Sequence, residues 1–98
     1  MAVEIIPSVL ALRGQAWRQR LRRAERVNPA IHVDLMDGHF VSTRSISVAS
    51  GLRWPPTNRT DVHLMVGQPM DWLPLLLRWP TRRIIVHCEL GADLRFML

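Results

Sequence analysis

Two histidines and an aspartate lie inside apolar stretches of this sequence. His32 and Asp34 are two residues apart in "AIHVDLM", and His63 lies in the similar stretch "TDVHLMV". Side chains two residues apart in a strand point to the same face, and neighbouring strands are about 4.8 Å apart, so the three side chains could reach one ion. Two imidazoles and a carboxylate suit Zn²⁺, Fe²⁺, Mn²⁺ or Co²⁺ without choosing among them. The spacing therefore predicts a site for one divalent metal ion.

An ordinary structural role is the alternative for each of these side chains. For His87, which stands alone in "RRIIVHCE", a hydrogen-bonded structural role and a role in a site are equally favoured. For His32, Asp34 and His63 the structural role is less favoured, because burying two imidazoles and a carboxylate is costly without a cation or mutual pairing.

Two methionines follow the predicted ligands at equivalent positions. Met36 is two residues beyond Asp34, and Met65 is two residues beyond His63. They could fill gaps in the core, as methionine does well, or form an apolar wall against the carbon skeleton of a sugar; the spacing leaves both open. Asp37 precedes a glycine, and this pair is a strong turn signal, so we expect a turn and capping role for Asp37 rather than catalysis.

The elements that must position these residues alternate between strand and helix. Short connections between alternating strands and helices are typical of right-handed βαβ units that build a parallel sheet, so the predicted fold class is α/β. In such sheets functional groups gather at the carboxyl ends of the strands. We expect strands over 3–8, 30–36, 60–66 and 82–89, helices over 11–27, 46–54 and 70–79, and the start of a further loop and helix in 90–98.

The composition is that of one soluble globular domain over residues 1–98. The chain has 98 residues, 48% of them hydrophobic and 21% charged, with a formal net charge of +5 and no lysine. An arginine-rich helix in a chain without lysine is better explained by a solvated outer face than by nucleic-acid binding, since no aromatic interleaving or groove-binding motif accompanies it. The arginines of this segment are Arg13, Arg18, Arg20, Arg22, Arg23 and Arg26.

Cysteine usage and hydropathy predict a cytoplasmic protein that neither crosses nor enters a membrane. Cys88 is the one cysteine, so no internal disulfide framework is expected. The amino-terminal segment lacks the pattern of a signal peptide, and the most apolar stretch, "WLPLLLRW", is short and interrupted by Pro74.

Four segments together resemble the ribulose-phosphate 3-epimerase family. They are "IIPSVLA", "IHVDLMDGHFV", "DVHLMV" followed by a Pro-Met-Asp segment, and "IIVHCE", in the family's order and approximate spacing over residues 4–89. The resemblance implies a (β/α)₈ barrel, here its amino-terminal half of about four βα units with parallel strands. It also implies an isomerase of the pentose phosphate pathway that uses one divalent metal ion to interconvert D-ribulose 5-phosphate and D-xylulose 5-phosphate at carbon 3.

The resemblance assigns roles to individual residues. His32, Asp34 and His63 would be metal ligands, and Asp34 would also be one of two acid/base groups. Ser8 and His63 would contact the sugar phosphate, and Met36 and Met65 would shield the enediolate. The second acid and the phosphate-binding loops come from later strands in the family.

A (β/α)₈ barrel typically needs about 250 residues and at least roughly 200. We therefore expect this chain, as half of a barrel, to be weak or inactive alone. One alternative is a non-catalytic half-barrel that assembles with a second copy or with a separate carboxyl-terminal half, because its edge strands would be open. Two others are an epimerase of a six-carbon ketose phosphate and a fragment of a longer reading frame.

Overall fold

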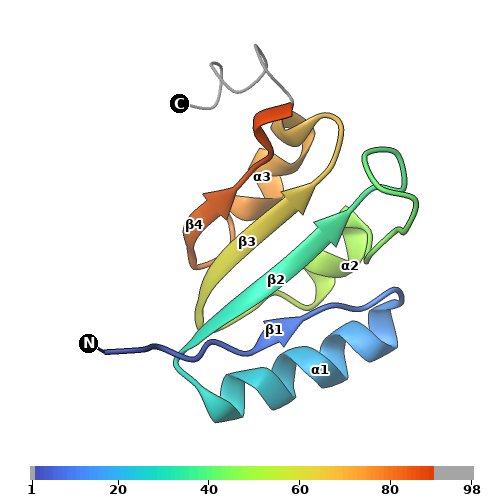
Figure 1. Ribbon diagram of the computed structural model, residues 1–98. Helices are drawn as coiled ribbons and strands as arrows, with labels where there is room; N and C mark the ends of the chain where they lie inside the picture. The colour runs from blue at the N-terminus through green and yellow to red at the C-terminus, as the bar shows by residue number, and fades with distance from the viewer. Residues whose placement is uncertain (1, 90–98) are drawn as a thin grey trace.

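Four parallel strands form a single sheet in which sequence neighbours lie side by side. The computed structural model describes residues 2–89 (Figure 1). Each connection is a crossover between adjacent strands, as the alternating pattern predicted. In order across the sheet the strands are β1 (Ser8–Val9), β2 (Ala30–Met36), β3 (Arg59–Met65) and β4 (Thr81–Ile85).

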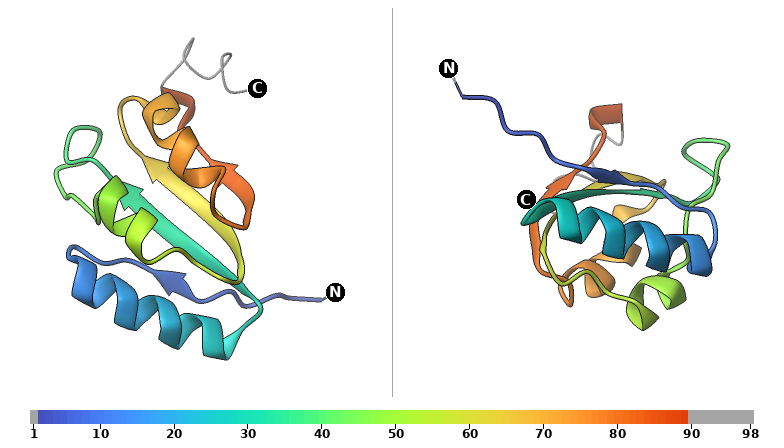
Figure 2. Two further views of the ribbon diagram at one scale, coloured as in Figure 1. Left: turned by 180° about the vertical axis from the view of Figure 1, so that it is seen from behind. Right: turned by 90° about the horizontal axis from the view of Figure 1, so that it is seen from below.

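The helices cover one face of this sheet and leave the other face without a helix in the described chain, as the two views of Figure 2 show. This arrangement is an α/β half-barrel of the kind expected for the TIM-barrel class, which confirms the predicted fold class. The helical segments are α1 (Gly14–Val27), α2 (Val48–Arg53), the 3₁₀ turn η1 (Pro69–Trp72) and α3 (Leu73–Leu76).

The predicted helices are longer than the observed ones. The chain bends at residues 12–13, and Arg13 still has extended backbone. Its carbonyl accepts the first helical bond from the N–H of Trp17, so α1 begins at Gly14 and not near residue 11. The predicted helix over 70–79 is instead η1 followed by the single turn of α3. Pro69 and Pro74 each lie in the first turn of one of these segments, where the missing N–H costs little.

The two edge strands are shorter than predicted. Ser8 lies opposite His32, so residues 3–5 extend past the start of β2 at Ala30 and have no neighbouring strand with which to pair. Val3 and Ile5 are accordingly each 82% exposed. On the other edge, β4 leaves the ladder after Ile85, which lies opposite His63, so the predicted strand over 82–89 ends four residues early. Residues 90–98, where the next helix was expected, lie outside the described residues.

The core lies between the helices and one face of the sheet. On β2 and β3 every second residue points into it, and these side chains are fully buried, as the period of two predicted. They are Ile31, Val33, Leu35, Val62 and Leu64. From α1 the buried residues are Trp17, Leu21 and Ala24, which recur at helical spacing. The rings of Trp17 and Trp79 stack with centroids 5.7 Å apart, and this contact joins α1 to the segment after α3.

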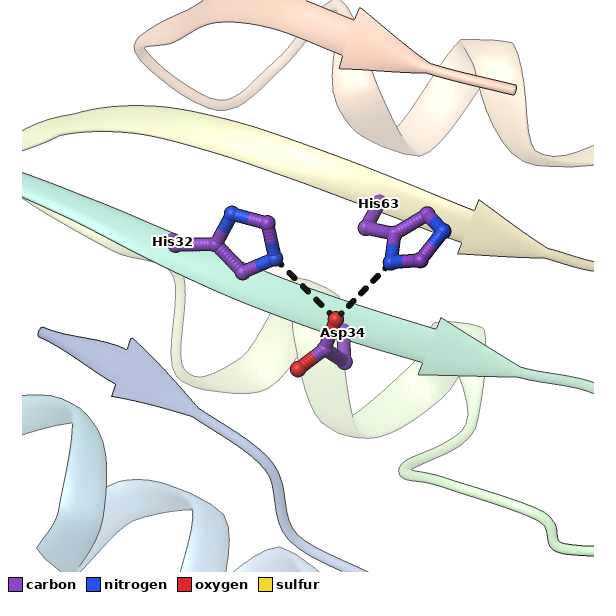
Figure 3. A group of neighbouring side chains, drawn as sticks. All are labelled: His32, Asp34 and His63. Carbon is purple, nitrogen blue, oxygen red and sulfur yellow. Dashed lines mark hydrogen bonds and ion pairs between the residues drawn. The ribbon is translucent and has the colours of Figure 1, made fainter. Parts of the chain in front are cut away.

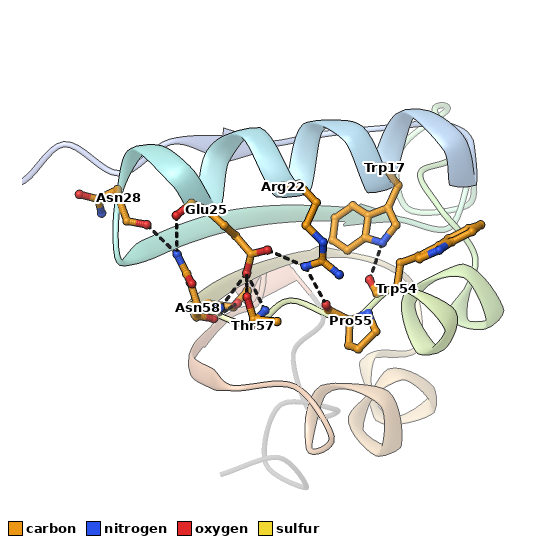
Figure 4. A network of polar contacts seen from close by, with 9 residues as sticks. Trp17, Arg22, Glu25, Asn28, Trp54, Pro55, Thr57 and Asn58 are labelled. Carbon is orange, nitrogen blue, oxygen red and sulfur yellow. Dashed lines mark hydrogen bonds and ion pairs between the residues drawn. The ribbon is translucent and has the colours of Figure 1, made fainter.

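A buried carboxylate fixes the start of β3 against the end of α1 (Figure 4). Glu25 Oε2 accepts hydrogen bonds from the N–H of Thr57 (2.6 Å), the hydroxyl of Thr57 (2.8 Å) and the N–H of Asn58 (2.7 Å), and Oε1 pairs with Arg22 at 2.7 Å. The side chain of Asn58 donates to the carbonyls of Glu25 and Asn28. Because Arg59 begins β3, this network contributes to the position of the strand that carries His63.

The remaining arginines of α1 point away from the core, as expected for an amphipathic helix. Arg18, Arg20, Arg23 and Arg26 are exposed. Within residues 2–89 no helix is both long enough and apolar enough to cross a membrane.

Candidate metal centre

The three predicted ligands converge on the face of the sheet that carries no helix (Figure 3). The parallel register pairs Asp34 with His63, and His32 lies two residues before Asp34 on the same face of β2. The two strands therefore bring together residues that are 29 positions apart in the chain. No other group of this kind occurs in the part of the chain that the structure describes.

The carboxylate of Asp34 is the centre of this cluster. Its Oδ1 atom lies 3.1 Å from Nε2 of His32 and 3.2 Å from Nδ1 of His63. One donor atom from each residue lies within 4.8 Å of the other two. The side chains are 28%, 18% and 27% exposed for His32, Asp34 and His63, so the cluster is open to small solutes while most of each side chain is shielded.

These donors fit a divalent metal ion in both chemistry and spacing. Imidazole nitrogen and carboxylate oxygen are ligands of Zn²⁺ and of divalent Fe, Mn and Co. A tetrahedral ion with bonds of about 2.0–2.1 Å separates its ligand atoms by about 3.4 Å, close to the two separations from Asp34 Oδ1. Small side-chain adjustments would be enough to accommodate an ion.

The second oxygen of Asp34 has a separate environment. The hydroxyl of Ser8 donates to Asp34 Oδ2 at 3.1 Å. Ser8 is the first residue of β1 and is exposed, so the open face gives access to this oxygen. The two oxygens of Asp34 are therefore distinguished: Oδ1 faces both imidazoles, and Oδ2 faces Ser8 and solvent.

The two methionines form an in-register pair on the same face as the ligands, two positions beyond them. Met36 is opposite Met65, two residues after the Asp34 and His63 pair on the same strands. Met36 is 6% exposed, and Met65 is partly buried. This placement fits both of the roles considered from the sequence, so a shielding role stays a prediction.

Asp37 closes the turn that leaves β2. Its carboxylate accepts hydrogen bonds from the N–H groups of His39 (2.8 Å), Phe40 (3.1 Å) and Gly67 (2.9 Å). Burial favours a higher pKa for this carboxyl group, but these three backbone hydrogen bonds outweigh it and lower the pKa of Asp37. Gly38 follows with a φ of 82°, in the left-handed region that favours glycine. The turn and capping role expected for Asp37 is confirmed.

His87 extends the cluster, although its place in the sequence left its role undecided. It lies two residues beyond the end of β4, and its Nε2 atom is 2.8 Å from Nε2 of His63. The alternation of strand residues could not place it, because the chain has already left the strand. A histidine near the carboxyl end of a neighbouring strand was the only signal available.

An ion pair on the same face is a feature that the residue spacing did not predict. Arg82 donates from Nε and Nη2 to the two carboxylate oxygens of Asp61, at 3.1 and 2.9 Å. The bond to Arg82 lowers the pKa of Asp61 and outweighs the opposing effect of burial. The pair occurs beside an irregularity in the β3 and β4 register, which a regular strand pattern does not predict.

Comparison with known proteins supports one family. Residues 4–97 match the ribulose-phosphate 3 epimerase family. The chain is 35% identical to the ribulose-phosphate 3-epimerase of Chlamydia pneumoniae over 69% of this chain and 31% of that protein. The corresponding enzyme of Bacillus subtilis is 29% identical over 89% of this chain and 42% of that protein. That of Chlamydia muridarum is 35% identical over 100% of this chain and 42% of that protein. The chain thus spans less than half the length of these relatives.

Proposed function

Because this chain belongs to the ribulose-phosphate 3 epimerase family, we propose that His32, Asp34 and His63 bind one divalent metal ion and that Asp34 transfers a proton at carbon 3 of a ketose phosphate. The observation that carries the proposal is the convergence of three donor atoms within 4.8 Å on the open face. D-Ribulose 5-phosphate is the proposed substrate and D-xylulose 5-phosphate the product, by analogy with the names of the relatives.

The reaction explains why these residue types are needed. The proton on carbon 3 is next to a ketone, so its removal requires a base and leaves negative charge on the carbonyl oxygen. A bound divalent ion acts as a Lewis acid toward that oxygen. The base must have an oxygen that is not engaged by the two imidazoles, and Asp34 Oδ2 meets this condition.

Neighbouring residues of the chain support the proposed roles of the metal ion and of Asp34. The Ser8 hydroxyl orients Oδ2 and would donate to a substrate oxygen once substrate displaces it from Asp34. Met36 and Met65 would provide an apolar boundary beyond the reacting carbon. Inversion at carbon 3 also needs a second acid on the opposite face, and within residues 2–89 no second carboxylate joins the cluster. We therefore expect little net epimerisation by the isolated chain.

Metal content tests the site without requiring turnover. The purified chain is loaded with Zn²⁺ and desalted, and bound metal is measured for wild type, His32→Ala, His63→Ala and the control His39→Ala. His39 is exposed and lies outside the cluster. We expect the first two variants to lose the metal and the control to keep it. Equal metal content in all four proteins would refute the proposed site.

Proton exchange tests the chemistry separately from inversion. A single base that removes and returns the proton on carbon 3 would exchange it for solvent deuterium in D₂O, which NMR detects in recovered ribulose 5-phosphate. We expect exchange with the metal-loaded wild type and none above background with Asp34→Asn. Exchange that is undiminished in Asp34→Asn would exclude Asp34 as the base. The same assay with a six-carbon ketose phosphate tests the alternative substrate.

A second candidate function is assembly, and the open sheet supports it. Both edges of the sheet are unpaired in the described chain, and apolar residues are exposed along them, with Val3 and Ile5 each 82% and Ile85 44% exposed. Unprotected edges of this kind favour pairing with another sheet. We propose that a second copy or a complementary half-barrel covers them. Light scattering measures the mass of the purified chain over a wide range of concentration. A monomer at every concentration would count against pairing with a second copy.

A further inference from the structure

We infer that His87 is a positioning residue: it accepts a hydrogen bond from Nε2 of His63 and so keeps Nδ1 of His63 free to bind the metal ion. The inference rests on the proposed function, because it gives His87 a role toward the same ion. His87 does not belong to the group of donors that converge on one point. Its role is therefore to orient a ligand and not to be one.

The geometry of the two rings is that of a hydrogen bond and not of stacking. The Nε2 atoms of His63 and His87 are 2.8 Å apart, whereas the ring centroids are 4.9 Å apart. Since the nitrogens are much closer than the centroids, the rings meet edge to edge. Their planes differ by 21° and are therefore nearly parallel, and two parallel rings whose nitrogens lie between the centroids are close to one common plane. An N–H on one ring therefore points at the in-plane lone pair of the other, as a strong hydrogen bond requires.

Only one arrangement of protons suits a metal ligand at His63. A neutral imidazole has one N–H donor and one acceptor nitrogen. The nitrogen that faces Asp34 Oδ1, at 3.2 Å, is Nδ1 of His63. For Nδ1 to bind a metal its lone pair must be free, which places the proton on Nε2. That proton then points to Nε2 of His87, which must be an acceptor.

The other side of His87 is consistent with this assignment. With Nε2 as the acceptor, the proton of His87 is on Nδ1, and Nδ1 lies 3.5 Å from the carboxylate oxygen Oε2 of Glu89. The sequence of groups from the cluster outward is thus Asp34, His63, His87 and Glu89. Carboxylates and carbonyls that accept from a metal-binding histidine fix its tautomer and ring orientation. Here a second histidine is interposed between the ligand and the carboxylate.

His87 is held in place from the β2 side of the sheet. The ring of Phe40 lies 4.9 Å from the His87 ring, centroid to centroid, at an angle of 50°. Phe40 is itself fixed by the hydrogen bond from its N–H to Asp37 Oδ1 at 3.1 Å. The His87 side chain is 30% exposed. The turn after β2 therefore supports a residue that follows β4, and that residue orients a ligand on β3.

Two substitutions of similar size separate an acceptor role from a packing role. His87→Gln keeps a carbonyl oxygen that can accept from His63, and His87→Leu fills similar space without an acceptor. Affinity is measured by titrating Co²⁺ into the full chain and following its visible absorption. Loss of an outer partner of a ligating histidine typically costs about 10–100-fold in metal affinity. We expect a loss in this range for His87→Leu and a loss of only a few-fold for His87→Gln.

The tautomer of His63 in the metal-bound protein provides a second readout, independent of affinity. Without metal, Nδ1 of His63 faces the acceptor oxygen Asp34 Oδ1 at 3.2 Å, so the measurement is made with diamagnetic Zn²⁺ bound: two-bond ¹H–¹⁵N correlation spectra of the Zn²⁺-loaded wild type should show His63 protonated on Nε2 and unprotonated on Nδ1. A proton on Nδ1 would overturn the inference, and so would unchanged Co²⁺ affinity in His87→Leu or equal losses in both variants. If His87→Leu does not fold, the wild-type tautomer and His87→Gln still decide. If the wild type does not bind Co²⁺, the proposed metal site is refuted and the role of His87 falls with it. This result differs from those that refute the role of His87 alone.

Discussion

Replacing Glu25 by alanine should lower the free energy of unfolding by more than the loss of an exposed ion pair on α1 would. The Glu25 side chain is 7% exposed, and one of its oxygens accepts from three donors of Thr57 and Asn58. Glu25→Ala leaves these donors without their acceptor. The N–H of Asn58 is partly buried, and a buried donor left unpaired costs about 1–3 kcal/mol. Thr57 is exposed, so water replaces part of what is lost.

We therefore expect Glu25→Ala to lower the free energy of unfolding by about 2–4 kcal/mol. For a domain of this size that corresponds to a fall in Tm of roughly 10–25 °C. Glu25→Gln keeps the shape but loses the charge, and one end of its amide presents hydrogens to donors, so an intermediate loss of about 1–2 kcal/mol is expected. Urea unfolding followed by tryptophan fluorescence measures both.

Arg22→Ala is the matched control. It removes the ion pair with Glu25, but the Arg22 side chain is 39% exposed, and exposed pairs contribute about 0–1 kcal/mol. The control should therefore lose less than either Glu25 variant. If Arg22→Ala were as destabilising as Glu25→Ala, or if Glu25→Ala lost less than about 1 kcal/mol, the carboxylate of Glu25 would not be the source of this stability.

Three further predictions concern pH and two glycines. Burial opposes ionisation of Glu25, but hydrogen bonds from Thr57, Asn58 and Arg22 outweigh it and lower its pKa below the usual 4.5. The ionised Glu25 carboxylate therefore stabilises the fold fully above pH 4.5, and this stabilisation is lost as pH falls through the lower pKa of the folded state. The difference in unfolding free energy between wild type and Glu25→Gln should shrink as the pH is lowered through this range. Gly38→Ala should cost roughly 1–2 kcal/mol in denaturant unfolding, since the φ of 82° disfavours any side chain. Gly51→Ala would place Cβ 2.9 Å from Trp79 Cζ2. Calorimetry should show that the free energy of unfolding falls by about 1–2 kcal/mol; an unchanged Tm would mean that the Trp79 side chain moves aside at no cost.

The alternation of residue types predicted much of the fold, because it is a local property. The buried faces of β2 and β3 and the buried positions of α1 agree with the periods of two and 3.6 residues. The strand over Ala30–Met36 was predicted at its observed bounds. The edge strands and short helices were predicted too long, because their ends depend on what lies beside them. Residues 3–5 have no neighbouring strand with which to pair, and η1 and α3 each contain a proline in the first turn.

The candidate site divides in the same way between sequence and tertiary structure. By itself, the sequence placed His32 and Asp34 on one face, because side-chain direction within a strand follows from spacing alone. The family resemblance, carried by local motifs, is confirmed by the match over residues 4–97. Register is not local, since it depends on how separate strands pair through the segments between them. Only the tertiary structure set Asp34 opposite His63 and turned Oδ1 toward both imidazoles. Only the tertiary structure also brought His87, beyond the end of its strand, to within 2.8 Å of His63.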